Sequence, residues 1–449
     1  MFDVIIKDAF VVFDEGVSKV NIGINNGIIS EVFSNDKEYD AVQTYSYENM
    51  YILPGGIDTH SHVTYCGSFK DGSKSAAAGG ISTIIEMPIS GYLPSACDEK
   101  IYLERVKLGE EECVIDFALW AGIQPNAYQN IKILKESGAA AFKVFMSNAG
   151  DYKYFDDYSL YTLMLTAKEH NALIGIHAEN ESLCNGFTSR YKDTNMGYEF
   201  FCESRPVIAE SEAVLRACFY ALNSGCKTHI CHVSNPRTAE LILEYKKKGA
   251  NITFETCPHY LSMTREDIGK YGAFAKCSPP LRYHSDVDSL WELVRNNDVD
   301  CIGTDHATYS SKDKSDVDFW KAPGGFPGND LFMPTLLDEG VIKRHIPIET
   351  IAKMISNKPA KSFGLDYCKG GIKVGHDADL VVVNLDSPWV YHAEDSLYAI
   401  KTDKYATEGK CFTSKVCATF VRGEKVYSDG TIVAQEGTGK YIKSIGGIR

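Results

Sequence analysis

The 449-residue chain lacks three features that would each point to a particular class of protein. No apolar run reaches the roughly 18 residues that a helix needs to span a bilayer. There is no excess of basic residues, since 46 Lys and Arg stand against 60 Asp and Glu, and the net charge of -14 repels phosphate backbones. The 14 cysteines include no C-x-x-C pair. We therefore expect neither a membrane nor a nucleic acid as a partner, and we expect reduced cysteines that are mostly buried.

The N-terminus also lacks the features of a secretory signal. Its first residues, MFDV, provide no basic segment and no small-residue cleavage site. Together with the reduced cysteines, this predicts a cytoplasmic protein. The composition, with 44% hydrophobic and 24% charged residues, is typical of a well-packed soluble protein and excludes disorder, collagen and a disulfide mini-scaffold.

The chain does contain a short apolar run that recurs, with helical patterns in between. The eight runs cover residues 52–58, 82–86, 114–120, 141–146, 173–177, 228–233, 251–256 and 299–305. Buried strands that alternate with amphipathic helices indicate a parallel sheet, and eight such units predict an α/β fold of the (β/α)8 TIM barrel type. The alternative is an open, doubly wound sheet, which usually carries a glycine-rich phosphate motif. Neither G-x-G-x-x-G nor a Walker A loop is present.

Both ends of the chain have a different pattern from the middle. Residues 1–51 and 371–449 contain short alternating runs separated by turn signals, and neither end has enough strands for a core of its own. We therefore predict one small β-sandwich domain formed by both chain termini, and a barrel domain over residues 52–370.

Polar side chains stand at the ends of the predicted barrel strands, where the active site of such a barrel lies. They are His60, His62, Glu86, Lys143, His177, His232 and Asp305. Residues two apart on a strand share a face, so both histidines of the first run can reach one cation. A cluster of this kind is hard to explain as core packing, and it predicts a metal site at the barrel mouth.

Two of these positions leave alternatives open. Lys143, inside an apolar run, is either a lysine that extends to solvent at a strand edge or one modified to a carbamate, which turns a cation into an oxygen ligand for two metals. His229 and His232 lie on opposite faces by strand alternation, so only one can face the barrel interior. We assign His232 to the site and His229 to a structural role.

Eight motifs of the chain resemble those of the amidohydrolase superfamily, and within it the cyclic amidohydrolases: hydantoinase/dihydropyrimidinase, allantoinase and dihydroorotase. The resemblance extends over nearly the whole chain. The motifs are PGGIDTHSH at 54–62, FKVFMS at 142–147, IHAE at 176–179, ESRP at 203–206, ICHVS at 230–234, ETCPHY at 255–260, CSPPLR at 277–282 and TDH at 304–306.

The resemblance implies a centre of two divalent metal ions, with zinc (Zn2+) expected. His60, His62 and Asp305 would hold one ion, His177 and His232 the other, and carbamylated Lys143 would bridge them. The resemblance also implies that Asp305 is catalytic, taking a proton from the attacking hydroxide and delivering it to the leaving nitrogen. Two residues are assigned to substrate binding. Ser278 would hold the amide edge of the ring through its backbone, and Asn148 stands where hydantoinases have a tyrosine.

The substrate loops give a mixed signal. The segment VTYC at 63–66 lacks the arginine that dihydroorotases use for a carboxylate, which disfavours that activity. EMP at 86–88 and GGFPG at 324–328 are similar to allantoinases, whereas TDHAT at 304–308 is closer to dihydropyrimidinases. We expect hydrolysis of the C–N bond of a small cyclic amide or ureide of the allantoin, hydantoin or dihydropyrimidine type.

Two other functions stay open at this point. One is hydrolysis of an acyclic N-acyl or dipeptide substrate, and the other is a non-catalytic scaffold of the dihydropyrimidinase-related kind. Retention of all six ligand positions argues against the scaffold. By resemblance we also expect a homotetramer or homodimer, and we expect residues 307–329 to shape the pocket.

Overall fold

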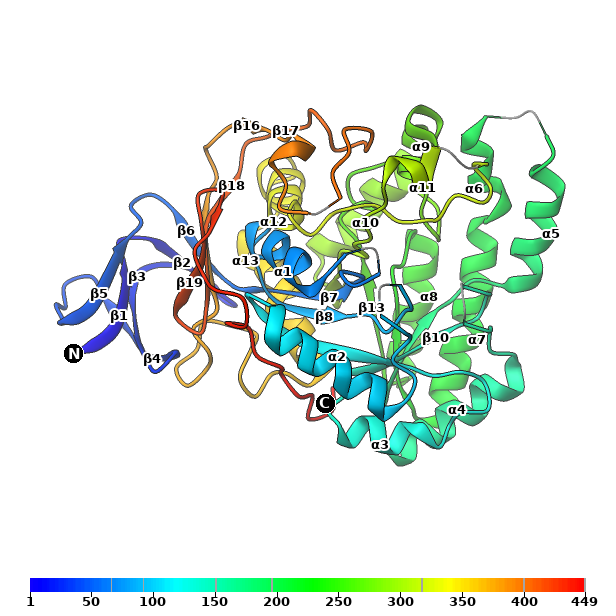
Figure 1. Ribbon diagram of the computed structural model, residues 1–449, viewed down its shortest axis with the longest axis horizontal. Helices are drawn as coiled ribbons and strands as arrows, with labels where there is room; N and C mark the ends of the chain where they lie inside the picture. Colours follow the sequence, from blue (N-terminus) through cyan, green and yellow to red (C-terminus); the bar gives the residue numbers. More distant parts are fainter. Residues whose placement is uncertain are drawn as a thin grey trace.

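A computed structural model of the chain describes residues 1–65, 67–91, 93–149, 152–194, 197–315, 318–398 and 400–447. Its centre is a barrel of eight parallel strands within this described part, each paired with the next along the chain (Figure 1). The strands are β7 (Gly56–Ser61), β8 (Ile81–Glu86), β9 (Asp116–Gly122), β10 (Ala141–Phe145), β11 (Leu173–His177), β12 (Lys227–Ile230), β13 (Ile252–Thr256) and β14 (Cys301–Ile302).

The barrel closes just beyond β14. A parallel bridge joins Ser61 to His306, and the Asp305 amide donates to the His60 carbonyl at 2.8 Å. The His62 amide in turn donates to the His306 carbonyl at 2.9 Å. The predicted (β/α)8 barrel is therefore confirmed, and its closure brings the polar ends of the first and last strands together.

Helices connect the strands and surround the barrel (Figure 1). They are α1 (Phe69–Ala78), α2 (Glu99–Glu112), α3 (Asn130–Glu136), α4 (Asp157–Glu169), α5 (Glu181–Tyr191), α6 (Phe201–Ser204), α7 (Val207–Ser224), α8 (Pro236–Lys247), α9 (Arg265–Tyr271), α10 (His284–Arg295), α11 (Ser311–Ser315), α12 (Phe332–Leu336), α13 (Ile348–Ala352) and α14 (Lys358–Phe363). Asp98, Asp156, Asn180 and Asn235 cap four of them, each accepting from a backbone N–H of the first turn. These caps fix where the chain leaves the barrel mouth.

Strands from both chain ends form a second sheet beside the barrel, at the left in Figure 1. Its strands in the described residues are β1 (Phe2–Lys7), β2 (Phe10–Phe13), β3 (Gly16–Asn25), β4 (Ile28–Ser34), β5 (Ala41–Ser46), β6 (Tyr51–Pro54), β15 (Leu380–Asn384), β18 (Lys415–Val421), β19 (Glu424–Ser428) and β20 (Thr431–Ile432). Tyr45 of β5 meets Phe420 of β18 edge to face at 5.2 Å, although the two strands are far apart in the sheet order. The sheet therefore folds over on itself around one apolar core, which confirms the predicted small β-domain built from both ends.

Trp120 of β9 fills the barrel interior below the mouth. Its indole N–H donates to the Thr59 carbonyl at 2.9 Å, next to His60. A Cβ at Gly175 of β11 would lie 2.1 Å from the Trp120 ring, so only glycine fits there, two residues before His177. Trp120 thus packs beneath the site and constrains the positions of His60 and His177.

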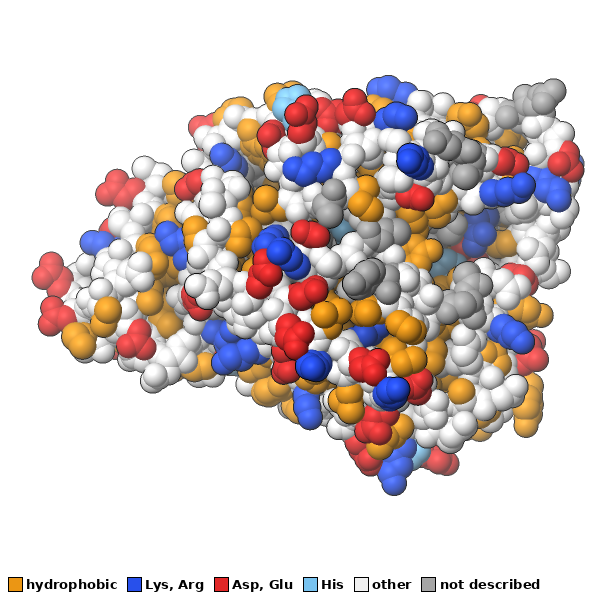
Figure 2. Space-filling view, viewed as in Figure 1, with side chains coloured by type: hydrophobic (Ala, Val, Ile, Leu, Met, Phe, Trp, Pro, Cys, Tyr) orange, Lys and Arg blue, Asp and Glu red, His pale blue; other side chains and the backbone are white. Residues whose placement is uncertain are grey.

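The structure also bears on the predicted state of the cysteines and on the predicted lack of a membrane-spanning helix. Of the 14 cysteines, 13 lie in the described residues, where none forms a disulfide and ten are buried, as predicted. Cys66 lies outside the described residues. Among the described helices, none combines the length and the apolar character needed to cross a membrane. On the face shown in Figure 2, acidic and basic side chains are intermixed.

Candidate metal centre and active site

A cavity of about 460 Å³ opens at the carboxyl ends of the barrel strands. The eight predicted site residues all line it: His60, His62, Lys143, Asn148, His177, His232, Ser278 and Asp305. They come from β7, β10, β11 and the segments that follow β7, β10, β12, β13 and β14, so the convergence is produced by the barrel and not by proximity in the chain.

The first half of the centre consists of His60, His62 and Asp305. Oδ1 of Asp305 lies 3.3 Å from Nε2 of His60 and 3.2 Å from Nε2 of His62. Burial alone would raise the pKa of Asp305, but these histidines and His232 hold it well below its usual value. One carboxylate oxygen and two imidazole nitrogens therefore share a space in which their ligand atoms all lie within 4.8 Å of one another.

The second half consists of His177 and His232. Nδ1 of His177 lies 3.0 Å from Nε2 of His232, and both side chains are buried. Burial lowers the pKa of His177 and places that of His232 well below the usual value, so both rings are neutral, the form that binds metals. Nδ1 of His232 finds no hydrogen-bond partner among the described residues.

Lys143 lies between these two halves with only 1% of its surface exposed. Its Nζ lies 5.3 Å from the centre of the Phe145 ring. None of the ion pairs in the described part of the chain includes it. A buried ammonium without a counter-ion is costly, so this geometry fits a lysine whose charge is removed.

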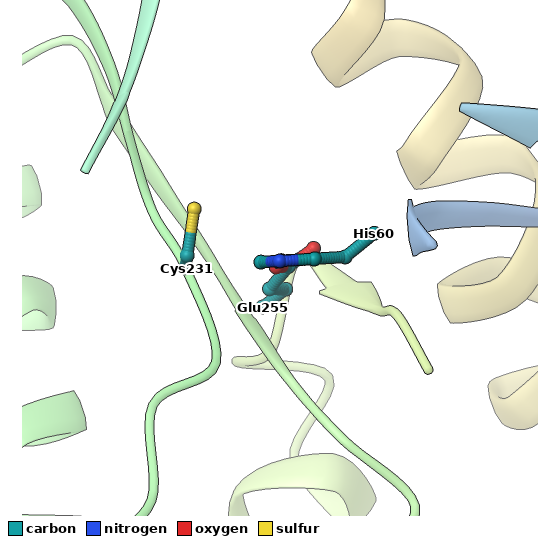
Figure 3. A group of neighbouring side chains, drawn as sticks. All are labelled: His60, Cys231 and Glu255. Carbon is teal, nitrogen blue, oxygen red and sulfur yellow. The ribbon is translucent and has the colours of Figure 1, made fainter. Parts of the chain in front are cut away.

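A buried carboxylate lies beneath the first half. Glu255 of β13 accepts from Nδ1 of His60 and from the Thr59 hydroxyl, and its Oε2 lies 3.3 Å from Nε2 of His229. Figure 3 shows His60 and Glu255 lying against each other, with Cys231 on the neighbouring segment after β12. Burial raises the pKa of the Cys231 thiol to about 12, and the contact of Glu255 with Nδ1 of His60 fixes the orientation of the His60 ring.

The alternation argument for His229 and His232 is wrong in one respect. β12 ends at Ile230, and His232 has a left-handed backbone with φ of 41°, so the two-residue period does not extend to it. His232 therefore lines the cavity, whereas His229 lies behind it, with its Nε2 3.3 Å from Oε2 of Glu255. His229 keeps the structural role assigned to it.

Glu86, the other acid at a strand end, holds the loop that follows His62. Its carboxylate accepts from the amides of Val63 and Thr64 at 2.9 and 3.0 Å and from the Thr64 hydroxyl at 2.6 Å. Because these bonds occupy both of its oxygens, Glu86 positions the entrance of the cavity and does not face its centre.

The substrate end of the cavity is lined by Ser278, Asn148, Tyr65, Tyr309 and Arg205. The Asn148 side chain donates to Glu181, which fixes its amide. Tyr65 and Tyr309 meet edge to face at 5.8 Å. The wall is therefore partly aromatic and partly polar, which suits a flat ring with amide edges.

Two buried lysines hold the described parts of residues 307–329 at the cavity. Lys276 donates to the carbonyls of residues 319, 320 and 322, and Lys314 donates to those of residues 273, 323 and 325. Ala307, Tyr309, Gly324 and Gly325 line the cavity from this segment. These contacts of Lys276 and Lys314 could not be predicted from the sequence, because their acceptors are backbone carbonyls.

The donor set suits divalent metal ions. It provides neutral imidazoles, one carboxylate and a buried amine without a counter-ion, and Nδ1 of His177 lies 3.0 Å from Nε2 of His232. Burial lowers the pKa of His60 to about 4, and the Lys143 ammonium adds to that effect. The residues present therefore fit the expected metal centre.

Comparisons with known proteins agree with this geometry. The sequence model described as the amidohydrolase family matches residues 51–426. Allantoinases from Deinococcus radiodurans and Rubrobacter xylanophilus are 35% and 36% identical over 440 and 453 residues, covering 95% and 98% of this chain and 96% and 98% of theirs. The solved structure of an L-hydantoinase (dihydropyrimidinase) from Arthrobacter aurescens matches with a TM-score of 0.95 and 30% identity, covering 99% of this chain and 100% of its own.

Proposed function

The chain belongs to the amidohydrolase family, and within it we propose that the protein opens a small cyclic amide or ureide by hydrolysing one of its C–N bonds. The observation that carries this proposal is the convergence of four histidines, a lysine and an aspartate on one cavity of about 460 Å³. Relatives named allantoinase and hydantoinase support an allantoin-type or hydantoin-type ring, and a dihydropyrimidine-type ring is a third candidate substrate.

We further propose a centre of two zinc ions. His60, His62 and Asp305 would hold one ion, and His177 and His232 would hold the other. Lys143, as its carbamate, would supply oxygen ligands to the centre. The distances of 3.2 and 3.3 Å from Asp305 to the first two histidines, and of 3.0 Å between the other two, support this division.

The chemistry follows from these roles. Two bound divalent ions would acidify a water molecule and polarise the scissile carbonyl. The water oxygen adds to the carbonyl carbon, the C–N bond breaks, and the product is an open chain with a carboxylate at one end. Asp305 carries the water proton to the departing amide nitrogen. Ser278 and Asn148 bind the ring edges, the former through its backbone.

Metal removal tests the centre, and a substrate panel tests the reaction. Treatment with a chelator should abolish activity, and zinc with bicarbonate should restore it. Allantoin, hydantoin, dihydrouracil, dihydroorotate and open-chain N-acyl amino acids should be assayed side by side, with metal content measured in the same preparation. Turnover of open-chain amides alone would overturn the cyclic substrate, and a fully active metal-free protein would overturn the centre.

By resemblance to the family we also propose that the protein is a homodimer or homotetramer in the cytoplasm. Light scattering of the purified chain measures the first, and cell fractionation the second. A monomer at micromolar concentration would contradict the assembly.

A further inference from the structure

Two side chains outside the proposed ligand set contact the rear of His177. Glu179 is fully buried just after β11, and its Oε2 lies 2.8 Å from Nε2 of His177. Arg205, which follows α6, donates from Nε to both oxygens of Glu179 at 2.9 and 3.2 Å and from Nη2 to Oε2. Arg205 also lines the cavity, so the three residues form a continuous chain from the barrel wall to the proposed centre.

The chemistry of this contact determines which nitrogen of His177 carries the proton. A neutral imidazole has one N–H and one lone pair, and an ionised carboxylate can only accept. Arg205 is always charged and donates to both oxygens of Glu179, so this buried ion pair keeps the carboxylate ionised. The proton of His177 therefore lies on Nε2, and the lone pair lies on Nδ1, the atom that faces His232.

We propose that Glu179 and Arg205 are positioning residues that fix the ring and the tautomer of His177, so that Nδ1 is always available to the ion shared with His232. This inference rests on the proposed metal centre and goes beyond its ligands. The other half of the centre has the opposite arrangement, because Glu255 binds Nδ1 of His60 and leaves Nε2 toward Asp305. Two buried carboxylates thus select different nitrogens of two histidines, one for each half.

Removing the carboxylate alone would leave a buried guanidinium unpaired, so the test replaces the ion pair as a unit. The double variant Glu179→Leu/Arg205→Met places apolar side chains of similar size there, an exchange that is often neutral for stability. The variant Glu179→Gln/Arg205→Met also lacks the ion pair but keeps one acceptor oxygen beside Nε2 of His177. The two variants therefore differ only at residue 179, where glutamine offers His177 an acceptor and leucine offers none.

The readout is zinc binding, measured by competition with a chromophoric chelator and by elemental analysis. We expect the Leu/Met variant to bind one of its two ions about 10–100-fold more weakly than wild type, the range found when the outer partner of a ligating histidine is lost. We expect the Gln/Met variant to recover most of that affinity. Glu203→Leu/Arg265→Met is the matched control, because this neighbouring ion pair at 2.9 Å contacts no histidine.

Three results would overturn the inference. Equal zinc affinity in the Leu/Met and Gln/Met variants would show that an acceptor beside His177 has no role. If the wild type binds two ions and the Leu/Met variant binds them with unchanged affinity, the positioning role is contradicted while the proposed metal centre stands. A wild type that binds no zinc would overturn the centre itself. Circular dichroism of the metal-free proteins verifies folding.

If the Leu/Met variant does not fold, the single variants Glu179→Gln and Glu179→Asp answer the same question. Glutamine keeps the contact and loses the charge, whereas aspartate keeps the charge and withdraws from Nε2. We expect weaker zinc binding in the aspartate variant, and the reverse order would contradict the proposal.

Discussion

Two buried clusters of charge lie at opposite ends of the barrel, and their contents differ. At the amino end, Lys369 pairs with Asp116, Asp379 and Asp377 at 2.5, 2.8 and 2.9 Å, and Arg422 pairs with Asp116. At the mouth, no ion pair with Lys143 exists among the described residues, and Nδ1 of His232 has no partner there.

The difference shows that buried charge serves stability at one end of the barrel and the proposed chemistry at the other. The Lys369 cluster joins the start of β9 to the segments that enter β15 and leave β18, and the protein itself satisfies each charge. The groups at the mouth are the side chains that we propose as metal ligands. We therefore expect substitutions in the first cluster to change stability and substitutions in the second to change activity.

The largest effect is expected for Lys143→Ala. It should lower kcat/KM by about 10³-fold or more, because charge stabilisation of several kcal/mol is lost at about 1.4 kcal/mol per factor of ten. The free energy of unfolding of the metal-free protein, measured in urea, should not fall, since the variant removes an unpaired buried ammonium. Added acetate or propionate should restore part of the activity. Lys107→Ala, at an exposed ion pair, is the control, and full activity without added acid would contradict the carbamate.

Lys369→Met should reverse this pattern. It leaves two buried carboxylates, Asp116 and Asp379, and the partly buried Asp377 with one cation fewer, so the free energy of unfolding should fall by about 3–5 kcal/mol. The folded fraction should keep its zinc content and its turnover per site. Lys7→Met, at the exposed pair with Asp8, should change stability by less than about 1 kcal/mol. Loss of zinc in the Lys369 variant would break the comparison.

Glu255→Gln tests a residue that shares features with both clusters. Like the Lys369 cluster it is paired within the protein, and like the residues at the mouth it acts on a proposed ligand, since it orients His60. Denaturant unfolding should show a loss of about 1–3 kcal/mol, because the buried Thr59 hydroxyl and Nδ1 of His60 lose a charged acceptor. Zinc affinity should fall by about 10–100-fold. A change in stability with unaltered zinc binding would place Glu255 with the structural cluster alone.

The smallest effect is a pH dependence of the Lys369 cluster. Burial alone would lower the pKa of Lys369, but Asp379 and Asp377 raise it above 10.5. A raised lysine pKa stabilises the folded state fully below the unfolded value, and this stabilisation is lost as the pH rises through the folded value. The difference in unfolding free energy between wild type and Lys369→Met should thus be constant from pH 7 to 9 and shrink only above about 10.5. Shrinkage already at pH 8 would contradict the assignment.

The fold could be predicted because its signals are local. Each apolar run that ends in a polar residue corresponds to a barrel strand, and the order of the runs is the order of the strands. The proposed ligands were found for the same reason, since they stand at the ends of those runs. Their roles stay predictions until the metal experiments are done.

The partners of these ligands were harder to find. Glu255, inside a buried apolar run, did carry a signal, because a buried carboxylate requires donors. Glu179 lies next to a ligand but its arginine comes 26 residues later, and nothing in the sequence pairs them. The alternation argument failed at His232, because alternation applies only within the strand and β12 ends at Ile230.

The sequence by itself determined the eight-unit barrel, the shared terminal domain and the residue types at the mouth, because hydrophobic period and strand ends are properties of short segments. Only the tertiary structure decided which nitrogen of each histidine faces the centre and which buried charges remain unpaired. Those outcomes depend on contacts of a few ångströms, many of them between residues tens to hundreds of positions apart, and only the folded chain brings these residues together.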